Sequence, residues 1–278
     1  MSGCGKCGTE VPDAVRDCPI CGTHHGFPNV KSAASEAAEL QGRWEAARLD
    51  ARGRGCDAQV QALEDALSAV HAVVNVDVGF LHRLLTNEHT LYSAYGKQVA
   101  AGVRAAASSE HDRQRTSVEG LLFGSWGNEL CYAALSLDGR GLTSYGEISL
   151  ELRDAAIDDR ASLLEENSFD FVRRHRLVPG DPLPRGYRAP WADRARLAVS
   201  KLASSVHEAT TANDHARLLL AANATRTTDD FVEVHVFGTF NQGAVAGVQV
   251  IGDAENAADQ VLLQAAKAKA AKLGLRWT

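Results

Sequence analysis

Residues 230–238, DFVEVHVFG, are the stretch that most clearly decides the fold. Apolar Val232, Val234 and Val236 alternate with other residues, which is the period of a β-strand with one buried face. Glu233 and His235 share the opposite face, because alternate residues of a strand point the same way. A carboxylate beside an imidazole suits the wall of a cleft, and it equally suits the solvent face of a half-buried strand. Both interpretations stay open at this level.

The second half of the chain carries further strand patterns, whereas the first half is mainly helical. The expected strands are 129–139, closed by the turn Asp138-Gly139, then Ser144 to Leu152, Arg160 to Glu166 and Ala244 to Gly252. The expected helices are Ser32 to Asp50, Ala58 to Val74, Asn87 to Ala107, Asp112 to Phe123, Trp191 to Thr211, and one capped by Asp253 that runs to Leu273. This order predicts an α+β fold with a mainly antiparallel sheet, not a parallel βαβ fold.

Four of the six cysteines fall in residues 4–22, CGKCGTEVPDAVRDCPICG. Cys4, Cys7, Cys18 and Cys21 form two Cys-x2-Cys pairs separated by ten residues, and a glycine follows each pair. Each pair can aim two thiolates at one point, and four thiolates complete a tetrahedral zinc shell with no open position for substrate. Two redox dithiols or two disulfides are the alternatives, but neither explains the ribbon-like spacing. We therefore predict a structural zinc ribbon, for which His24 or His25 could replace one cysteine.

The length of 278 residues and the change of pattern along the chain predict three parts. Residues 1–27 form the zinc ribbon and residues 28–56 a linker helix that ends at the sequence ARGRG. Residues 57–278 form the main domain, in which 57–125 are helical and 126–278 are α+β. The ribbon resembles the short zinc ribbons at the ends of many bacterial proteins, which act as docking or folding modules.

Composition and charge exclude several classes of protein. With 35 acidic and 29 basic residues the net charge is −6, which disfavours nucleic acid as the main partner, and residues 1–55 are neutral. The first ten residues contain no apolar signal segment, and charged and polar residues interrupt the apolar stretch from Ala69 to Leu85. We expect a cytoplasmic protein without membrane association. No phosphate-binding P-loop, dinucleotide-binding glycine motif or hydrolase nucleophile elbow is present in the sequence.

Several short motifs resemble the ADP-ribosyltransferase-like domains of bacterial toxins. Residues 233–238, EVHVFG, look like their glutamate strand, which reads Glu-x-Gln or Glu-x-His, then an apolar pair and glycine. The segments 144–146 (SYG), 160–162 (RAS) and 166–168 (ENS) resemble their Ser-Tyr-Gly strand, Arg-x-[Ser/Thr] strand and acidic-x-Ser turn. Residues 73–251 also resemble, as a whole, an uncharacterised group of bacterial proteins.

The resemblance implies chemistry on NAD as substrate. It makes Glu233 the catalytic carboxylate, with Ser144 supporting it or the ribose and His235 nearby in the cofactor site. It also implies that Tyr145 stacks on nicotinamide and that Arg160 pairs with the pyrophosphate. Ordinary structural roles remain open for each: a turn at 144–146, surface ion pairs for Arg160, and a helix cap at 166–168.

The sequence also departs from members of this fold that use Arg, Ser-Thr-Ser and Glu-x-Glu motifs. It has Thr143-Ser144-Tyr145 in place of Ser-Thr-Ser, and His235 in place of the second glutamate. The early NAD-binding arginine has four candidates, which are Arg104, Arg113, Arg115 and Arg140. The resemblance thus predicts an ADP-ribosyltransferase-like enzyme whose ribbon docks on an intracellular protein target. The alternative is a non-catalytic adaptor, in which the α+β domain serves as a scaffold for the ribbon.

Overall fold

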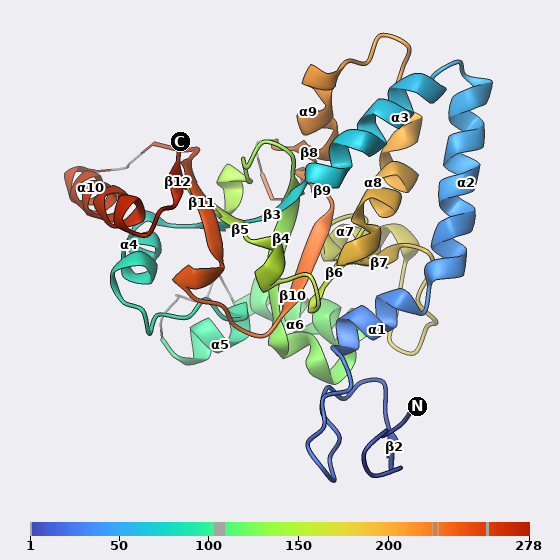
Figure 1. Cartoon of the computed structure of the whole chain (residues 1–278), viewed down its shortest axis with the longest axis horizontal. Coiled ribbons are helices and arrows are strands. Elements are labelled where there is room, and N and C mark those ends of the chain that lie inside the picture. The colour runs from blue at the N-terminus through green and yellow to red at the C-terminus, as the bar shows by residue number, and fades with distance from the viewer. Residues whose placement is uncertain (1, 103–108, 224, 227, 254–255) are drawn as a thin grey trace.

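The computed structural model describes the whole chain except residues 1, 103–108, 224, 227 and 254–255 (Figure 1). Its centre is an eight-stranded sheet in the order β12-β11-β5-β3-β4-β10-β6-β7. The strands are β3 (His71–Val76), β4 (Leu130–Ser136), β5 (Ile148–Leu152), β6 (Ala161–Leu164), β7 (Arg188–Pro190), β10 (Glu233–Phe237), β11 (Val245–Val250) and β12 (Arg276–Trp277). Neighbouring strands are antiparallel, apart from the parallel pair β11 and β12. The predicted α+β class with a mainly antiparallel sheet is confirmed.

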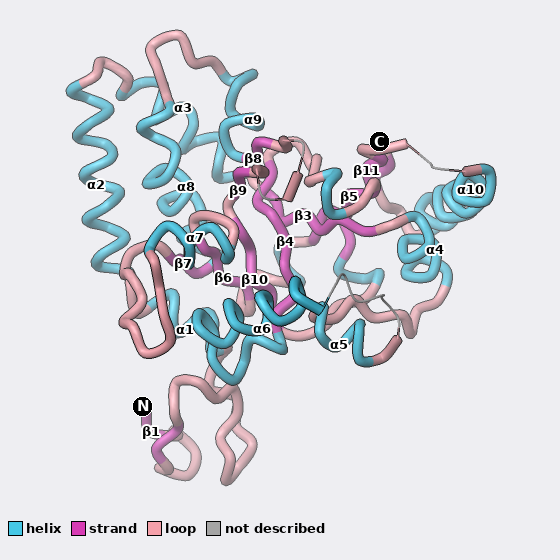
Figure 2. The backbone as a smooth tube through the Cα atoms, turned by 180° about the vertical axis from the view of Figure 1, so that it is seen from behind, coloured by secondary structure: helices cyan, strands magenta, loops and turns pink. Residues whose placement is uncertain are grey.

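Helices cover one face of the sheet across its full width (Figures 1 and 2). They are α2 (Ala37–Gly53), α3 (Asp57–Ala66), α4 (Val78–Thr86), α8 (Arg194–Leu202) and α10 (Ala257–Lys272). Their apolar side chains form one core cluster with Val232, which directly precedes β10, and with Val234 and Val236 within that strand. The alternation in DFVEVHVFG therefore sends its valines into this core and leaves Glu233 and His235 on the other face.

The other face of the sheet is covered only in part. Helices α6 (Ser109–Phe123) and α7 (Ser168–His175) pack there through Phe123 and Phe171 on Leu130, Leu164 and Phe237. The remaining described elements are α1 (Pro28–Ala34), α5 (Tyr95–Ala100), α9 (His215–Leu219), the hairpin β8 (Leu220–Ala221) with β9 (Asp230–Phe231), and β1 (Ser2–Gly3) with β2 (Glu10–Val11). No described helix is long and apolar enough to span a bilayer.

The helix predicted over Ala58 to Val74 is wrong in its second half. The helix ends at Ala66, a 3-10 turn follows, and residues 71–76 form β3 in the middle of the sheet. Val70 and Val74 are four residues apart, a spacing that serves the helical and the strand period alike. The β-branched run Val73-Val74 and Val76 favours the strand, and pairing with β4 and β5 secures it.

Other predicted elements are present with shifted bounds. The predicted strand from Ser144 begins as a 3-10 turn, and β5 starts only at Ile148. Within the described part of 87–107, only Tyr95–Ala100 is α-helical, and 103–107 lie outside the described residues. The helix predicted over Trp191 to Thr211 is α8 flanked by 3-10 turns. The last helix is capped by Asn256 instead of Asp253.

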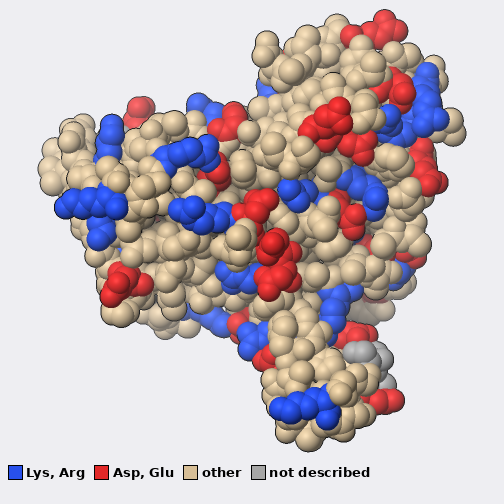
Figure 3. All heavy atoms as spheres, in the orientation of Figure 1, with Lys and Arg blue, Asp and Glu red and all other residues tan. Residues whose placement is uncertain are grey.

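Residues 28–56, predicted as a linker helix, form α1 and α2, and both pack on the main domain. Glu36, between the two helices, is fully buried. Its Oε1 accepts a hydrogen bond from Arg188 Nε at 2.7 Å, and its Oε2 accepts one from the Gly186 backbone at 2.9 Å. A buried carboxylate needs such partners, so this segment belongs structurally to the main domain. The ribbon projects from the molecule beyond α1 (Figures 1 and 3).

We predict that Glu36→Gln lowers the free energy of unfolding by about 3 kcal/mol, because it leaves the Arg188 guanidinium without its charged partner. Urea unfolding at equilibrium measures the change. Glu45→Gln is the matched control, since Glu45 lies exposed on α2. A loss for Glu36→Gln no larger than that of the control would contradict the docking of this segment.

Candidate functional site

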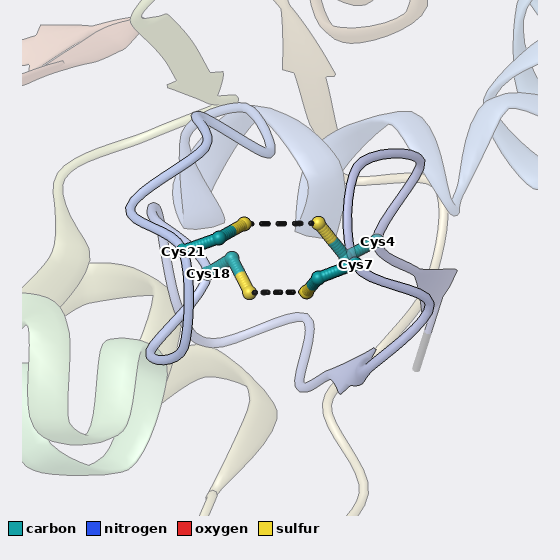
Figure 4. A group of neighbouring side chains, drawn as sticks. All are labelled: Cys4, Cys7, Cys18 and Cys21. Carbon is teal, nitrogen blue, oxygen red and sulfur yellow. Dashed lines mark hydrogen bonds between the residues drawn. The ribbon is translucent and has the colours of Figure 1, made fainter.

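The four ribbon cysteines converge at one point, from two knuckles with the same backbone pattern (Figure 4). In the first, Gly8 N donates to Cys4 O at 2.8 Å and Cys4 N to Thr9 O at 2.8 Å. In the second, Gly22 N donates to Cys18 O at 2.9 Å and Cys18 N to Thr23 O at 2.8 Å. Gly8 and Gly22 have φ of 73° and 68°, so each closes its turn in the conformation that glycine tolerates best.

The sulfur positions fit a zinc ion. Cys4 Sγ lies 3.5 Å from Cys21 Sγ and Cys7 Sγ lies 3.6 Å from Cys18 Sγ, and all four lie within 4.8 Å of one another. Four sulfurs at about 2.3 Å from a tetrahedral zinc would be about 3.8 Å apart. The Thr23 hydroxyl and backbone N–H lower the pKa of the Cys21 thiol to about 6, which favours the thiolate that zinc requires. Four cysteine ligands would fill the shell, so such a site serves the fold and not catalysis.

We expect the purified chain to contain about one zinc ion, and Cys18→Ser to lose it, because three thiolates hold the ion less tightly. Metal analysis by mass spectrometry measures this ratio. Cys56→Ser is the control, since the Cys56 thiol is buried elsewhere, beside Arg54. A wild-type ribbon that is metal-free and stably folded would refute the site.

A cavity of about 1020 Å³ opens on the partly covered face of the sheet. Its floor is formed by β3, β4 and β10, and its walls by α6, the first turn of α7, the loop at Leu142–Tyr145 and residues 225–226. This volume is at the upper end of the range of about 300–1,000 Å³ for small-molecule sites. The cavity walls combine aromatic rings with carboxylates, guanidiniums and amides.

Glu233 lines this cavity and is held by three donors. It lies at the start of β10, between β4 and β6, and is 5% exposed. Its Oε1 accepts hydrogen bonds from the Ser168 hydroxyl and from His235 Nε2, the latter at 2.7 Å. Its Oε2 has only a long contact with the Ser168 backbone N–H, at 3.4 Å. Oε1 is thus saturated by the protein, and Oε2 retains acceptor capacity for a ligand.

His235 has a supporting position and is not among the residues that line the cavity. Its side chain is 1% exposed and packs against the rings of Phe123 and Tyr132. The Ser168 hydroxyl donates to the carboxylate and not to the imidazole, so the three groups do not form the nucleophile–base pair of a serine hydrolase. Their arrangement instead orients Glu233.

The cavity wall also carries a second carboxylate and a guanidinium that lies over two aromatic rings. Arg115 Nε donates to Glu119 Oε1 at 2.7 Å, and the guanidinium lies 4.7 Å from the ring of Tyr95 and 4.6 Å from that of Tyr132. Burial, and then the negative charges of Glu119 and Glu233, raise the pKa of the Tyr132 phenol, which stays neutral. Of the four candidates for the early arginine, Arg115 lines the cavity, whereas Arg104 lies outside the described residues.

Tyr145 also lines the cavity. Its hydroxyl accepts a hydrogen bond from Asn167 Nδ2 at 3.3 Å, and the guanidinium of Arg226 lies 4.8 Å from its ring. Burial, followed by the charge of Glu233, raises the pKa of Tyr145 to about 12, so its hydroxyl keeps its proton. Asn167 is also the N-cap of α7, where its side chain accepts from Phe169 N.

Ser144 and Arg160 are not brought to the cavity wall, so the expectation of one cleft lined by Ser144, Arg160 and Glu233 is wrong. The Ser144 hydroxyl donates to Asp229, which positions the neighbouring loop. The Arg160 guanidinium donates to the carbonyls of Ala156, Phe237 and Thr239, beyond the far end of β10. Arg160 directly precedes β6, whose first residue, Ala161, pairs with Val236, whereas Glu233 pairs with Leu164 at the other end of the ladder. The register therefore separates residues 160 and 233 along the sheet.

The sequence patterns did not identify several residues that line or support the cavity. Glu119 could have been found from its i,i+4 spacing to Arg115 on a predicted helix. Ser168 belongs to the predicted acidic-x-Ser turn at 166–168. Its hydrogen bond to Glu233 joins residues 65 apart in the chain, so no local pattern indicates it. No protein-family model and no curated protein matches this sequence.

Proposed function

We propose that the protein binds NAD in this cavity and transfers the ADP-ribose of NAD to an intracellular protein target. Glu233 is the catalytic carboxylate. The observation that carries the proposal is the burial and hydrogen bonding of the Glu233 carboxylate. It is buried on a cavity wall, fixed by Ser168 and His235, and has one oxygen free to accept a hydrogen bond. The three donors suit the ionised form of the carboxylate.

The reaction needs a negative charge beside a sugar carbon. The bond between C1′ of the ribose and the pyridinium nitrogen breaks, and its electron pair goes to nicotinamide, which leaves neutral. C1′ becomes oxocarbenium-like, and a lone pair of the acceptor then forms the new bond as the acceptor loses a proton to solvent. Glu233 Oε2 would accept the ribose 2′-OH hydrogen bond, which strengthens as positive charge develops on the ring.

Aromatic and cationic groups of the cavity wall support a dinucleotide as ligand. Tyr95, Tyr132 and Tyr145 each offer a ring. Arg115 and Arg226, each stacked on a cavity tyrosine, take the phosphate role that the resemblance gave to Arg160.

The ribbon completes the proposal as a docking module for the target. It projects from the main domain, and Ile20, at the tip of its second knuckle, is 71% exposed. The same exposure favours the alternative function, a non-catalytic adaptor in which the ribbon alone contacts a partner.

Glu233→Gln is expected to lower nicotinamide release from labelled NAD by a factor of about 100 to 1,000, since the amide keeps the shape but not the charge. Ser168→Ala is expected to lower kcat about tenfold with little change in KM, because only the orientation of the carboxylate suffers. Glu88→Gln, at an exposed glutamate that is not part of the cavity wall, is the control. Equal release by wild type and Glu233→Gln, or no release with any target tested, would favour the adaptor.

A further inference from the structure

The junction between the ribbon and α1 is bonded directly to the strand that carries Glu233. Asn29, in the first turn of α1, is 2% exposed. Its Nδ2 lies 3.0 Å from Arg160 O, 3.1 Å from Ser162 Oγ and 3.0 Å from His235 O. The amide has two hydrogens for these three oxygens, so it shares them. The three acceptors also fix the orientation of the amide, because the reversed orientation would place its oxygen against them.

These contacts lie along the ladder between β6 and β10. His235 pairs with Ser162 and Val236 with Ala161 in the antiparallel register, and Phe237 N donates to Arg160 O just beyond them. Asn29 thus bridges the two strands with side-chain bonds that add to their backbone ladder. One of the carbonyls that Asn29 bonds is that of His235. The imidazole of the same residue, His235, forms the hydrogen bond to Glu233 Oε1.

A short segment connects Asn29 to the metal knuckle. The second knuckle ends at Thr23, and the ring of His24 contacts that of Phe27 at 4.9 Å. Phe27 in turn packs on Phe237 at the end of β10, at 5.4 Å between ring centroids. Lys31 Nζ also donates to Val15 O within the ribbon, at 3.0 Å. The ribbon therefore has side-chain contacts to β10 and to α1, besides the covalent chain.

We propose that Phe27 and Asn29 are positioning residues through which the zinc-bound ribbon keeps strand β10, and with it the Glu233 carboxylate, in place. Zinc that binds only the folded ribbon stabilises whatever is coupled to it, so loss of zinc loosens β10. Coupling of this kind is reciprocal, so a ligand that orders β10 also tightens the binding of zinc. The consequence for turnover rests on the proposed NAD chemistry, whereas the coupling itself does not.

The test is amide hydrogen exchange in the full-length chain, before and after removal of zinc with a chelator. In the wild type, chelation is expected to speed exchange in residues 233–237 about tenfold, as the loss of one to two hydrogen bonds would. Exchange in α10 should not change. In the Asn29→Ala variant, the amides of residues 233–237 should exchange fast even with zinc bound. Chelation should change their exchange rate little. Ser35→Ala, at the exposed residue that directly follows α1, should behave like the wild type.

Two results would overturn the proposal: faster exchange confined to residues 2–27, or an equal rise in 233–237 and α10. If Asn29→Ala does not fold, Phe27→Leu replaces it, because it removes the ring contact with Phe237 but keeps an apolar side chain. In NAD cleavage, chelation should lower kcat and leave KM within about twofold. Zinc-dependent exchange in a chain that cleaves no NAD would retain the coupling and reject the proposed function.

Discussion

The structure depends on the packing of strand β10, whose valine face is buried in the main apolar core while its other face carries Glu233 and His235. Val232, Val234 and Val236 pack into the cluster formed with α3, α4, α8 and α10. Pairing with β4 on one side and β6 on the other prevents the strand from sliding, because a shift of one residue would exchange its two faces. Glu233 and His235 are thereby directed to the face on which the cavity lies.

Burial of a carboxylate at that position has a cost that the neighbouring groups offset. A carboxylate removed from water is stable only when hydrogen bonds or opposite charges replace its hydration. Ser168 supplies two donors from the start of α7, and His235 supplies a third. Glu233 lines the cavity, and because its donors are concentrated on Oε1, Oε2 retains acceptor capacity. The arrangement that makes Glu233 stable thus also leaves it able to bind. Stability of the fold and competence of the site therefore depend on the same contacts.

The sequence predicted those features that short-range patterns encode. The cysteine cluster that could hold zinc follows from paired cysteines and their glycines, and β10 from the alternation in 230–238. The structure divides that predicted strand, because residues 230–231 form β9 and residues 233–237 form β10. The same pattern placed Glu233 and His235 on one face of the strand. Only the structure shows that Glu233 lines a cavity. The spacing of Val70 and Val74 could not separate helix from strand, so β3 was missed. Roles that depend on contacts between distant segments, such as those of Glu119 and Asn29, have no local signal.

Arg160 shows why a motif resemblance alone does not locate a ligand. An arginine near a strand start suits a phosphate, yet here the guanidinium is used to hold three carbonyls of neighbouring loops. Arg115 and Arg226, two of the cations that lie on the cavity wall, come from a helix and from a loop whose positions only the folded chain defines. The resemblance indicated the carboxylate, and the fold supplies its surroundings.

The most direct measurement is a crystal structure of the chain with an NAD analogue that resists cleavage. The account predicts the analogue in the sheet-face cavity, with the ribose 2′-OH within hydrogen-bond distance, about 2.7 Å, of Glu233 Oε2. It also predicts that the diphosphate lies near Arg115 or Arg226. An analogue bound elsewhere on the chain, or a ribose turned away from Glu233, would contradict the account.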